Sequence, residues 1–387
     1  MATATFTLPL LVLATTDSPA LTGTAFALEW VPRLAAFGRA GALVARHGAA
    51  RVMRWAAATR ALVLLMAIPV LAGAAGGAAT TATVMALAAV NGVLSQFSYV
   101  AAETAGAAAS QATTRPHQVQ GVLLGIDQGA MLAGPAAGAA LLQWGGPGWL
   151  LGAVAAMSAT AAAAAAVPAG PPGPGTASAE RSAAPGVSGW ATLKSLPALA
   201  WLVAGLAVSN LATGTLEAAA PVIVVRNLRH SSASVGAVWS VAAAATLLVV
   251  AASRPAIERW GLWPVGALSA AVASVACLGV AQAHRFPAYT VLVAVLVAAE
   301  AGMTVVLRTL RSQLVPQEVF APTLAVTILI LLLPFPLAGV LIACTPPAAL
   351  GRLLTGLAVL QATALAAAFI KARKALAPHR AAVGSSG

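Results

Sequence analysis

The sequence contains very little charge for its length. Of its 387 residues only 8% are charged and 60% are hydrophobic, and the mean hydropathy is +0.90. A water-soluble protein of this composition could not cover its surface with polar groups, so the soluble globular class is excluded. The chain is expected to be solvated by lipid, in which one helical crossing takes about 20 apolar residues.

Acidic residues are scarcer than basic ones, and cysteine is almost absent. Nine Asp and Glu residues stand against 21 Lys and Arg residues, which gives a formal net charge of +12. The basic residues fall between apolar segments and not in polar runs with aromatic residues, so nucleic acid is not an expected partner. Cys277 and Cys344 are too few for a disulfide framework, and we interpret them as packing residues.

The sequence also lacks the motifs of an enzyme. None of its lysines, Lys194, Lys371 and Lys374, follows a glycine, so the phosphate-binding G-K-[ST] loop is absent and ATP is not an expected partner. No metal-ligand cluster and no pair of nucleophile and base stands in or beside an apolar segment. We therefore predict no enzymatic activity, no metal and no cofactor.

Long apolar segments make up most of the chain. They predict an all-α integral membrane protein, because only helices or closed barrels satisfy their backbone in lipid. The first segment reaches only about 21 Å at about 1.5 Å per residue, less than the hydrocarbon thickness of about 30 Å. We expect either residues upstream of Met1 or a truncated first helix. The twelve predicted helices are 3–16, 20–44, 55–77, 79–104, 119–143, 147–168, 196–222, 232–253, 262–283, 287–310, 321–344 and 348–370.

A stretch rich in Pro, Gly, Ser and Ala divides these helices into two groups of six. Its composition is typical of a flexible linker. Lys and Arg gather at alternate ends of the segments, which places both termini and the linker in the cytoplasm. The predicted organisation is an N-terminal six-helix half over 1–168, a cytoplasmic linker over 169–194, a C-terminal six-helix half over 195–371 and a cytoplasmic tail over 372–387.

The accumulation of Lys and Arg at cytoplasmic ends explains the charge of the basic stretch 37–55 but not the spacing of its glycines and arginines. Gly41, Arg46 and Gly48 fall on the pattern G-x-x-x-D-R-x-G-R-R, Arg51 stands at its basic end, and Ala45 occupies the position of the aspartate. The stretch resembles the loop between the second and third helices of the major facilitator superfamily. The resemblance implies a gating loop that has lost its acid.

A second resemblance lies in the predicted helix 119–143. Gly121, Gly134, Pro135 and Gly138 fall on the spacing of the antiporter motif of the same superfamily, with Ala130 in place of one glycine. Small residues let helices approach closely, and an internal proline kinks a helix. The resemblance implies a helix built for export by antiport.

An internal repeat supports the same family. Glu258, Arg259 and Gly261 align with Ala45, Arg46 and Gly48, and Pro316 aligns with Pro116. Two related six-helix halves are the plan of the superfamily fold. The chain looks most like bacterial drug and siderophore exporters, which implies the bacterial cytoplasmic (inner) membrane.

Five charged residues inside the predicted crossings are candidates for transport. Each intramembrane charge costs about 3 kcal/mol, which favours positions that face the bundle interior. Asp127 and Glu300 either carry protons or make structural hydrogen bonds. Glu29 and Arg33, four residues apart on one helix face, form either a static ion pair or a pair that breaks between conformations. Glu217 could meet substrate or solvent in an outward-facing cavity.

These features together predict a secondary active transporter. We expect it to export a small organic molecule, a drug or siderophore, by proton antiport with alternating access. The alternatives are an uptake symporter and a transport-inactive, permease-like sensor or scaffold. The predicted partners are the small organic substrate, protons and the lipid bilayer.

Overall fold

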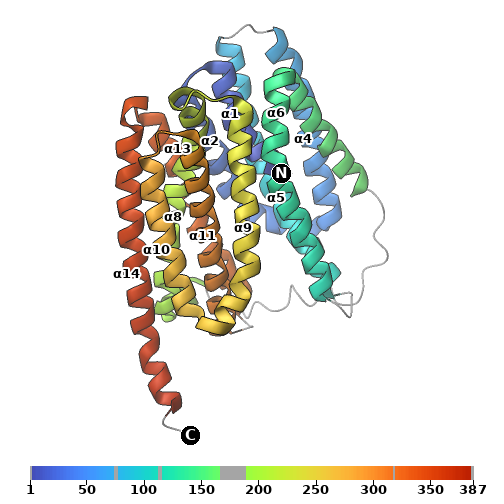
Figure 1. Ribbon diagram of the computed structural model, residues 1–387. Coiled ribbons are helices and arrows are strands. Elements are labelled where there is room, and N and C mark those ends of the chain that lie inside the picture. Colours follow the sequence, from blue (N-terminus) through green and yellow to red (C-terminus); the bar gives the residue numbers. More distant parts are fainter. Residues whose placement is uncertain (1, 74–76, 112–115, 166–188, 317–318, 385–387) are drawn as a thin grey trace. The chain divides into compact units, whose positions relative to one another are not determined.

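The computed structural model describes residues 2–73, 77–111, 116–165, 189–316 and 319–384 (Figure 1). These residues form helices and no strands, which confirms the all-α prediction for the described part of the chain. The α-helices are α1 (Ala2–Thr16), α2 (Pro19–Ala35), α3 (Phe37–His47), α4 (Ala49–Gly73), α5 (Ala78–Gln111), α6 (Pro116–Ala164), α7 (Gly189–Ser195), α8 (Pro197–Val222), α9 (Ser232–Trp260), α10 (Leu262–Ala281), α11 (Phe286–Leu314), α12 (Phe320–Leu332), α13 (Pro334–Cys344) and α14 (Leu350–Gly384). A π-helical turn, η1 (Ile223–Asn227), continues α8, and a 3₁₀ turn, η3 (Pro347–Ala349), precedes α14.

Each of the twelve predicted segments falls on helix, but three breaks change how the segments map onto helices. The segment 20–44 is divided at Ala36 into α2 and α3. Two predicted segments share α6, where Gly146 has a non-helical φ of 74° and ψ of −176°. The segment 321–344 is divided before Pro334, because the proline ring removes a helical hydrogen bond.

Several helices also run past the boundaries that hydropathy predicts. The helix α4 begins at Ala49, so Arg51 and Arg54 lie on its first turns. The helix α9 continues to Trp260, so Glu258 and Arg259 lie on its last turn. Hydropathy marks where a helix leaves the hydrocarbon and not where its hydrogen bonds end, so the loops are shorter than predicted.

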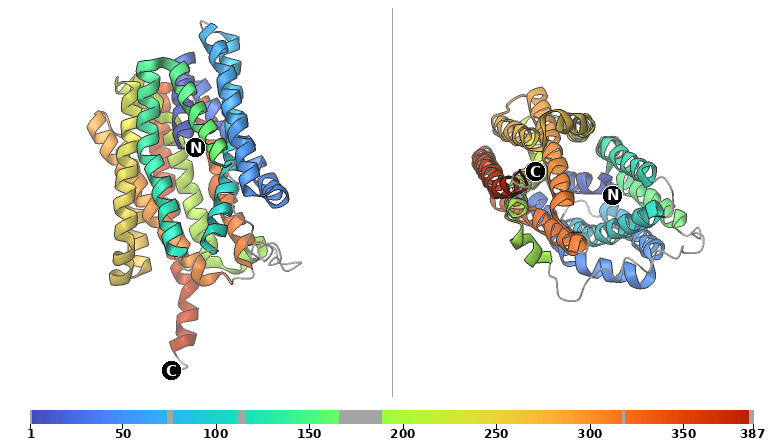
Figure 2. Two further views of the ribbon diagram at one scale, coloured as in Figure 1. Left: turned by 90° about the vertical axis from the view of Figure 1, so that its right-hand side faces the viewer. Right: turned by 90° about the horizontal axis from the view of Figure 1, so that it is seen from below.

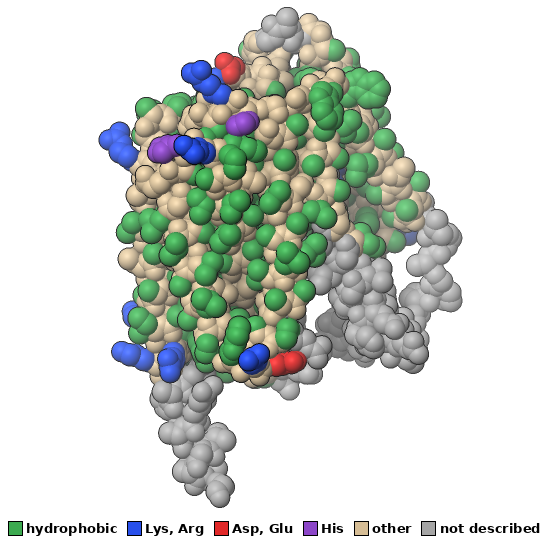
Figure 3. Space-filling view, viewed as in Figure 1, with side chains coloured by type: hydrophobic (Ala, Val, Ile, Leu, Met, Phe, Trp, Pro, Cys, Tyr) green, Lys and Arg blue, Asp and Glu red, His purple; other side chains and the backbone are tan. Residues whose placement is uncertain are grey.

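The exposed surface of the helices agrees with a membrane protein. Nine stretches of the described residues are long and apolar enough to cross a membrane. Met66, Leu248 and Val275 are among many large hydrophobic side chains that are more than half exposed. On the face in Figure 3, hydrophobic side chains spread over the middle and charged side chains gather toward the two ends. Lipid contact accounts for this pattern, which would be costly in water.

The helices form two compact units. Unit 1 comprises 1–177, 217–240 and 336–347, and unit 2 comprises 178–216, 241–335 and 348–387. In unit 1, α4 packs against α5 and α6, and α2 packs against α5 (Figure 2). In unit 2, α10 packs against α11 and α14. The predicted division into two six-helix halves with a linker stays a prediction.

Candidate transport site

A buried polar cluster in unit 1 joins α2 to α5. Glu29 is fully buried, and Asn91 Nδ2 donates a hydrogen bond to its Oε1 at 3.2 Å. One turn later, Arg33 Nε donates to Gln96 Oε1 at 3.4 Å. Each member of the pair that the sequence places on one face of α2 thus has a partner on α5.

Arg60 of α4 adds a second base to this cluster. Its side chain is only 7% exposed, and its Nη2 donates to Ser95 Oγ at 3.2 Å. Glu29 is the acid that acts most strongly on both Arg33 and Arg60. Within this buried group two bases stand against one acid. We call it the arginine cluster, and its residues are Glu29, Arg33, Arg60, Asn91, Ser95 and Gln96.

Arg33 is the member of the arginine cluster that is half-buried and not enclosed. Its guanidinium carbon lies 4.4 Å from the centre of the Trp30 ring, within the range of a cation–π interaction. Tyr99 of α5 and Glu217 of α8 are also within electrostatic reach of Arg33. Four residues therefore act on the Arg33 guanidinium: Glu29 and Trp30 of α2, Tyr99 of α5 and Glu217 of α8.

A second polar cluster surrounds Glu300 in unit 2. Ser209 Oγ and Thr213 Oγ1 each donate to Glu300 Oε1 at 2.6 Å. Gln361 Nε2 donates to Ser209 Oγ at 2.8 Å and lies 3.5 Å from Glu300 Oε1. All three partners are buried, and no basic side chain of the described residues forms a salt bridge with Glu300. We call Ser209, Thr213, Glu300 and Gln361 the carboxyl cage.

Sequence reasoning missed the partners in both clusters. Arg60 is not among the candidates from the sequence, because a helix that starts at residue 55, as hydropathy predicts, and not at Ala49 has Arg60 near its end. Ser209 and Thr213 stand four residues apart on apolar α8, and that spacing was the available signal for a polar face. Their acceptor is 87 to 91 residues away along the chain, which no local pattern indicates.

The predicted gating loop is a tight turn between two helices. Gly48, which ends α3, has φ 82° and ψ 149°, and its aligned counterpart Gly261 has φ 87° and ψ 164°. Both lie in a region that L-residues other than glycine rarely adopt, which supports the alignment of the two loops. The motif residues Gly41, Arg46, Arg51, Glu258 and Arg259 are exposed, and the side chain of Ala45 lies outside the described residues.

The structure shows the surroundings of three of the four residues of the antiporter-like motif. Gly134, Pro135 and Gly138 are buried on α6. A Cβ atom on Gly236 of α9 would overlap the carbonyl oxygen of Pro135, so the two helices touch through their backbones. Gly121 lies on α6, but its surroundings and the side chain of Asp127 lie outside the described part of the chain, and the predicted roles of both residues stay predictions.

Polar contacts also join the ends of several unit 1 helices. Arg226 of η1 forms an ion pair with Asp17, which precedes α2. The backbone N–H of Ala233 donates to Gln143 Oε1 at 2.7 Å. Asp17 is 88% exposed, and an exposed ion pair contributes about 1 kcal/mol or less, so this pair contributes little to stability.

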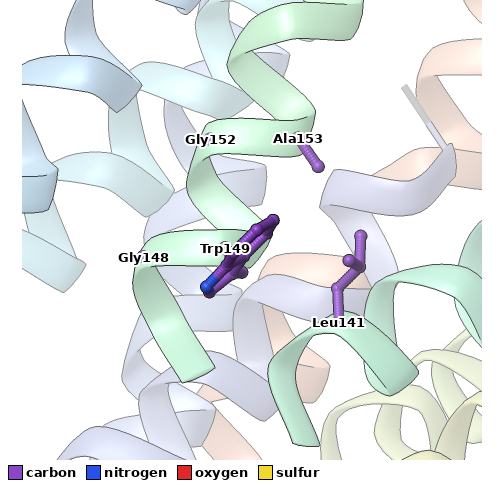
Figure 4. Close-up of a pocket in the computed structure, with 5 residues that line it drawn as sticks. All are labelled: Leu141, Gly148, Trp149, Gly152 and Ala153. Atoms are coloured by element: carbon purple, nitrogen blue, oxygen red, sulfur yellow. The ribbon is translucent and has the colours of Figure 1, made fainter. Parts of the chain in front are cut away.

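A pocket of about 560 Å³ lies between the two parts of α6 (Figure 4). It is lined by Leu141 from the first part of α6 and by Gly148, Trp149, Gly152 and Ala153 from the second part. The lining contains no acid, base or hydroxyl. The pocket shares no residue with the arginine cluster or the carboxyl cage.

Comparison with known proteins supports one family. The model of the Major Facilitator Superfamily matches residues 1–326. Among solved structures, a bacterial homologue of the iron transporter ferroportin in an inward-facing state has a TM-score of 0.74 at 13% identity, over 97% of this chain and 95% of that chain. The nucleoside transporter NupG has a TM-score of 0.70 at 13% identity, over 95% of each chain. A bacterial homologue of the human lysosomal transporter Spinster has a TM-score of 0.69 at 14% identity, over 97% and 95%. No curated protein sequence matches the chain.

Proposed function

Because the chain belongs to the major facilitator superfamily and is a secondary transporter, not an enzyme, we propose that it exports a small organic molecule in exchange for protons. The observation that carries the proposal is the carboxyl cage. Glu300 is an intramembrane acid whose described hydrogen-bond partners are two hydroxyls and an amide. A carboxyl group that is not held by a basic partner can both take up and release a proton.

The chemistry of the cage suits both protonation states of Glu300. The hydroxyl groups of Ser209 and Thr213 donate to a carboxylate, and after rotation they accept from a protonated carboxyl group. Glu29 differs, because two arginines balance its charge. Of these two intramembrane acids, Glu300 is therefore the better proton carrier, and Glu29 the better structural counter-ion.

The packing of α6 against α9 supports the direction of transport. The buried Gly134, Pro135 and Gly138 of the antiporter-like motif lie where Gly236 lets the two backbones meet. A drug or siderophore as cargo, the bacterial inner membrane and cytoplasmic termini belong to the same proposal. They rest on the resemblance of the motifs and on the distribution of Lys and Arg.

The test is proton-coupled flux in liposomes that contain the purified full-length protein. Siderophores and drug-like dyes are supplied under an imposed pH gradient, and a pH-sensitive dye inside the vesicles reports cargo-dependent proton movement. Glu300→Gln should abolish gradient-driven flux and keep gradient-free exchange of labelled cargo. Glu103→Gln, a matched change at an exposed acid, should behave like the wild type. Unchanged gradient-driven flux in Glu300→Gln would contradict the proposal.

The same experiment separates the other possibilities. Loss of coupling in Asp127→Asn but not in Glu300→Gln would indicate that the proton carrier is Asp127 on α6 and not Glu300. Cargo that moves with the protons and not against them would indicate an uptake symporter. Absence of flux for every cargo would favour the transport-inactive sensor or scaffold.

A further inference from the structure

The geometry points to a binding site for an anionic group of the transported solute at Arg33, with Arg60 behind it. This inference rests on the proposed function and narrows its substrate class to organic anions such as carboxylates. Its basis is the charge of the arginine cluster. Two buried or half-buried guanidinium groups share one buried acid, Glu29, and the second acid that acts on Arg33, Glu217, is half-buried on α8. Like charges in a low-dielectric interior repel each other. An anion brought to Arg33 would reduce the repulsion between the two guanidinium groups.

Among the described residues, the hydrogen bond of Arg33 to Gln96 involves its Nε and not its Nη atoms. Gln96 accepts from Nε, and Trp30 covers one face of the guanidinium. These contacts fix the plane of the group while Nη1 and Nη2 take no part in them. The two Nη atoms are the donors with which arginine holds a carboxylate in two parallel hydrogen bonds. Arg33 is therefore pre-oriented for an anionic group.

Arg60 contributes a second, deeper charge. Its Nη2 is used by Ser95, and its Nε is buried with no hydrogen-bond partner among the described residues. A buried guanidinium with an unused N–H is costly unless the site has another use for it. Its positive field adds to that of Arg33 and favours an anion over a neutral analogue of the same shape.

Glu217 supplies an internal competitor for the same guanidinium. It is half-buried on α8 and lies within electrostatic reach of Arg33. A bound anion must share the field of Arg33 with this carboxylate. Neutralising Glu217 should therefore strengthen anion binding, whereas neutralising Arg33 should weaken it, and these opposite signs distinguish a binding site from a structural cluster.

The experiment measures binding to the purified full-length protein without a pH gradient. The probes are aromatic carboxylates paired with their own amides, such as salicylate and salicylamide, and the readout is ligand-induced thermal stabilisation over a concentration series. We expect the carboxylate of a pair to bind more tightly than its amide. Arg33→Gln should weaken carboxylate binding by about ten- to a hundredfold, the range for a charge-assisted hydrogen bond.

The control variants keep the result interpretable. Arg39→Gln, the same change at an exposed arginine of α3, should bind like the wild type, and Glu217→Gln should bind carboxylates more tightly. Arg33→Lys keeps the charge without the planar fork and should be intermediate, which serves if Arg33→Gln does not fold. Equal binding of carboxylate and amide, or no Arg33-dependent stabilisation in the whole panel, would overturn the site. Proton coupling at Glu300 is tested separately in vesicles, so either hypothesis can fail alone.

Discussion

Gly92 of α5 lies directly against the backbone carbonyl of Glu29 on α2. A Cβ atom at this position would overlap the carbonyl oxygen, so a larger residue would push the two helices apart. The close approach is what brings Asn91 to Glu29 and Gln96 to Arg33. The polar contacts of the arginine cluster therefore depend on one missing side chain.

Substituting Gly92 with Ala should destabilise the protein by about 1–3 kcal/mol, the usual cost of overpacking a tight contact. The measurement is the midpoint of thermal unfolding in detergent, followed by tryptophan fluorescence. Gly41→Ala is the matched control, because nothing lies within 4 Å of a Cβ there and alanine favours the helix by about 1 kcal/mol. Equal midpoints for the two variants would show that α2 and α5 do not depend on the contact.

Gly48→Ala and Gly261→Ala should each destabilise the protein by about 1–2 kcal/mol. Both glycines have a positive φ, and a side chain adds strain in that region whatever the space around it. Gly73→Ala is a suitable control, because Gly73 ends α4 without a positive φ and with open space around it. The unfolding midpoint again reports the result. A stabilised Gly261 variant beside a destabilised Gly48 variant would argue against equivalent turns in the two loops.

Removing the hydroxyl donors of the carboxyl cage should reduce proton-coupled transport more strongly than it reduces the stability of the fold. Ser209→Ala and Thr213→Val each remove one hydrogen bond from Glu300, at a cost of about 1–3 kcal/mol to its carboxylate. Gradient-driven flux should fall about tenfold in each variant, while gradient-free exchange persists. Thr215→Val is the control, since the Thr215 hydroxyl donates to Leu211 of its own helix. Wild-type flux in the double variant would exclude the cage from coupling.

The helices were predictable because lipid leaves a buried backbone few alternatives, so each long apolar run had to be helical. Their ends were less predictable. The predicted helix that begins at residue 55 leaves out the first two, basic turns of α4. With that start Arg60 is expected near a helix end, whereas its side chain is buried. Glu300 could be selected from the sequence because an acid is rare in an apolar helix. Its cage could not, because Gln361 reaches it from a helix far along the chain.

The two predicted gating loops differ at the acidic position of the motif, and that difference can be reversed by substitution. Glu258 stands in the last turn of α9, whereas its aligned position in the first loop is Ala45, in the last turn of α3. An acid at position 45 would lie close in sequence to Arg46 and Arg51, and pairing with arginines would hold the loop closed. It would also oppose the helix dipole at the end of α3, so the effect on stability should stay within about 1 kcal/mol.

Ala45→Asp should therefore slow cargo exchange with little change in the unfolding midpoint. The measurement is the initial rate of gradient-free exchange in liposomes, compared with Ala50→Asp, the same change at an exposed position on α4. A second variant, Glu258→Ala, should act in the opposite direction and speed exchange, because it removes the acid that the second loop has kept. If Ala45→Asp and Ala50→Asp exchange cargo at the same rate, the acid missing from the first loop has no part in gating.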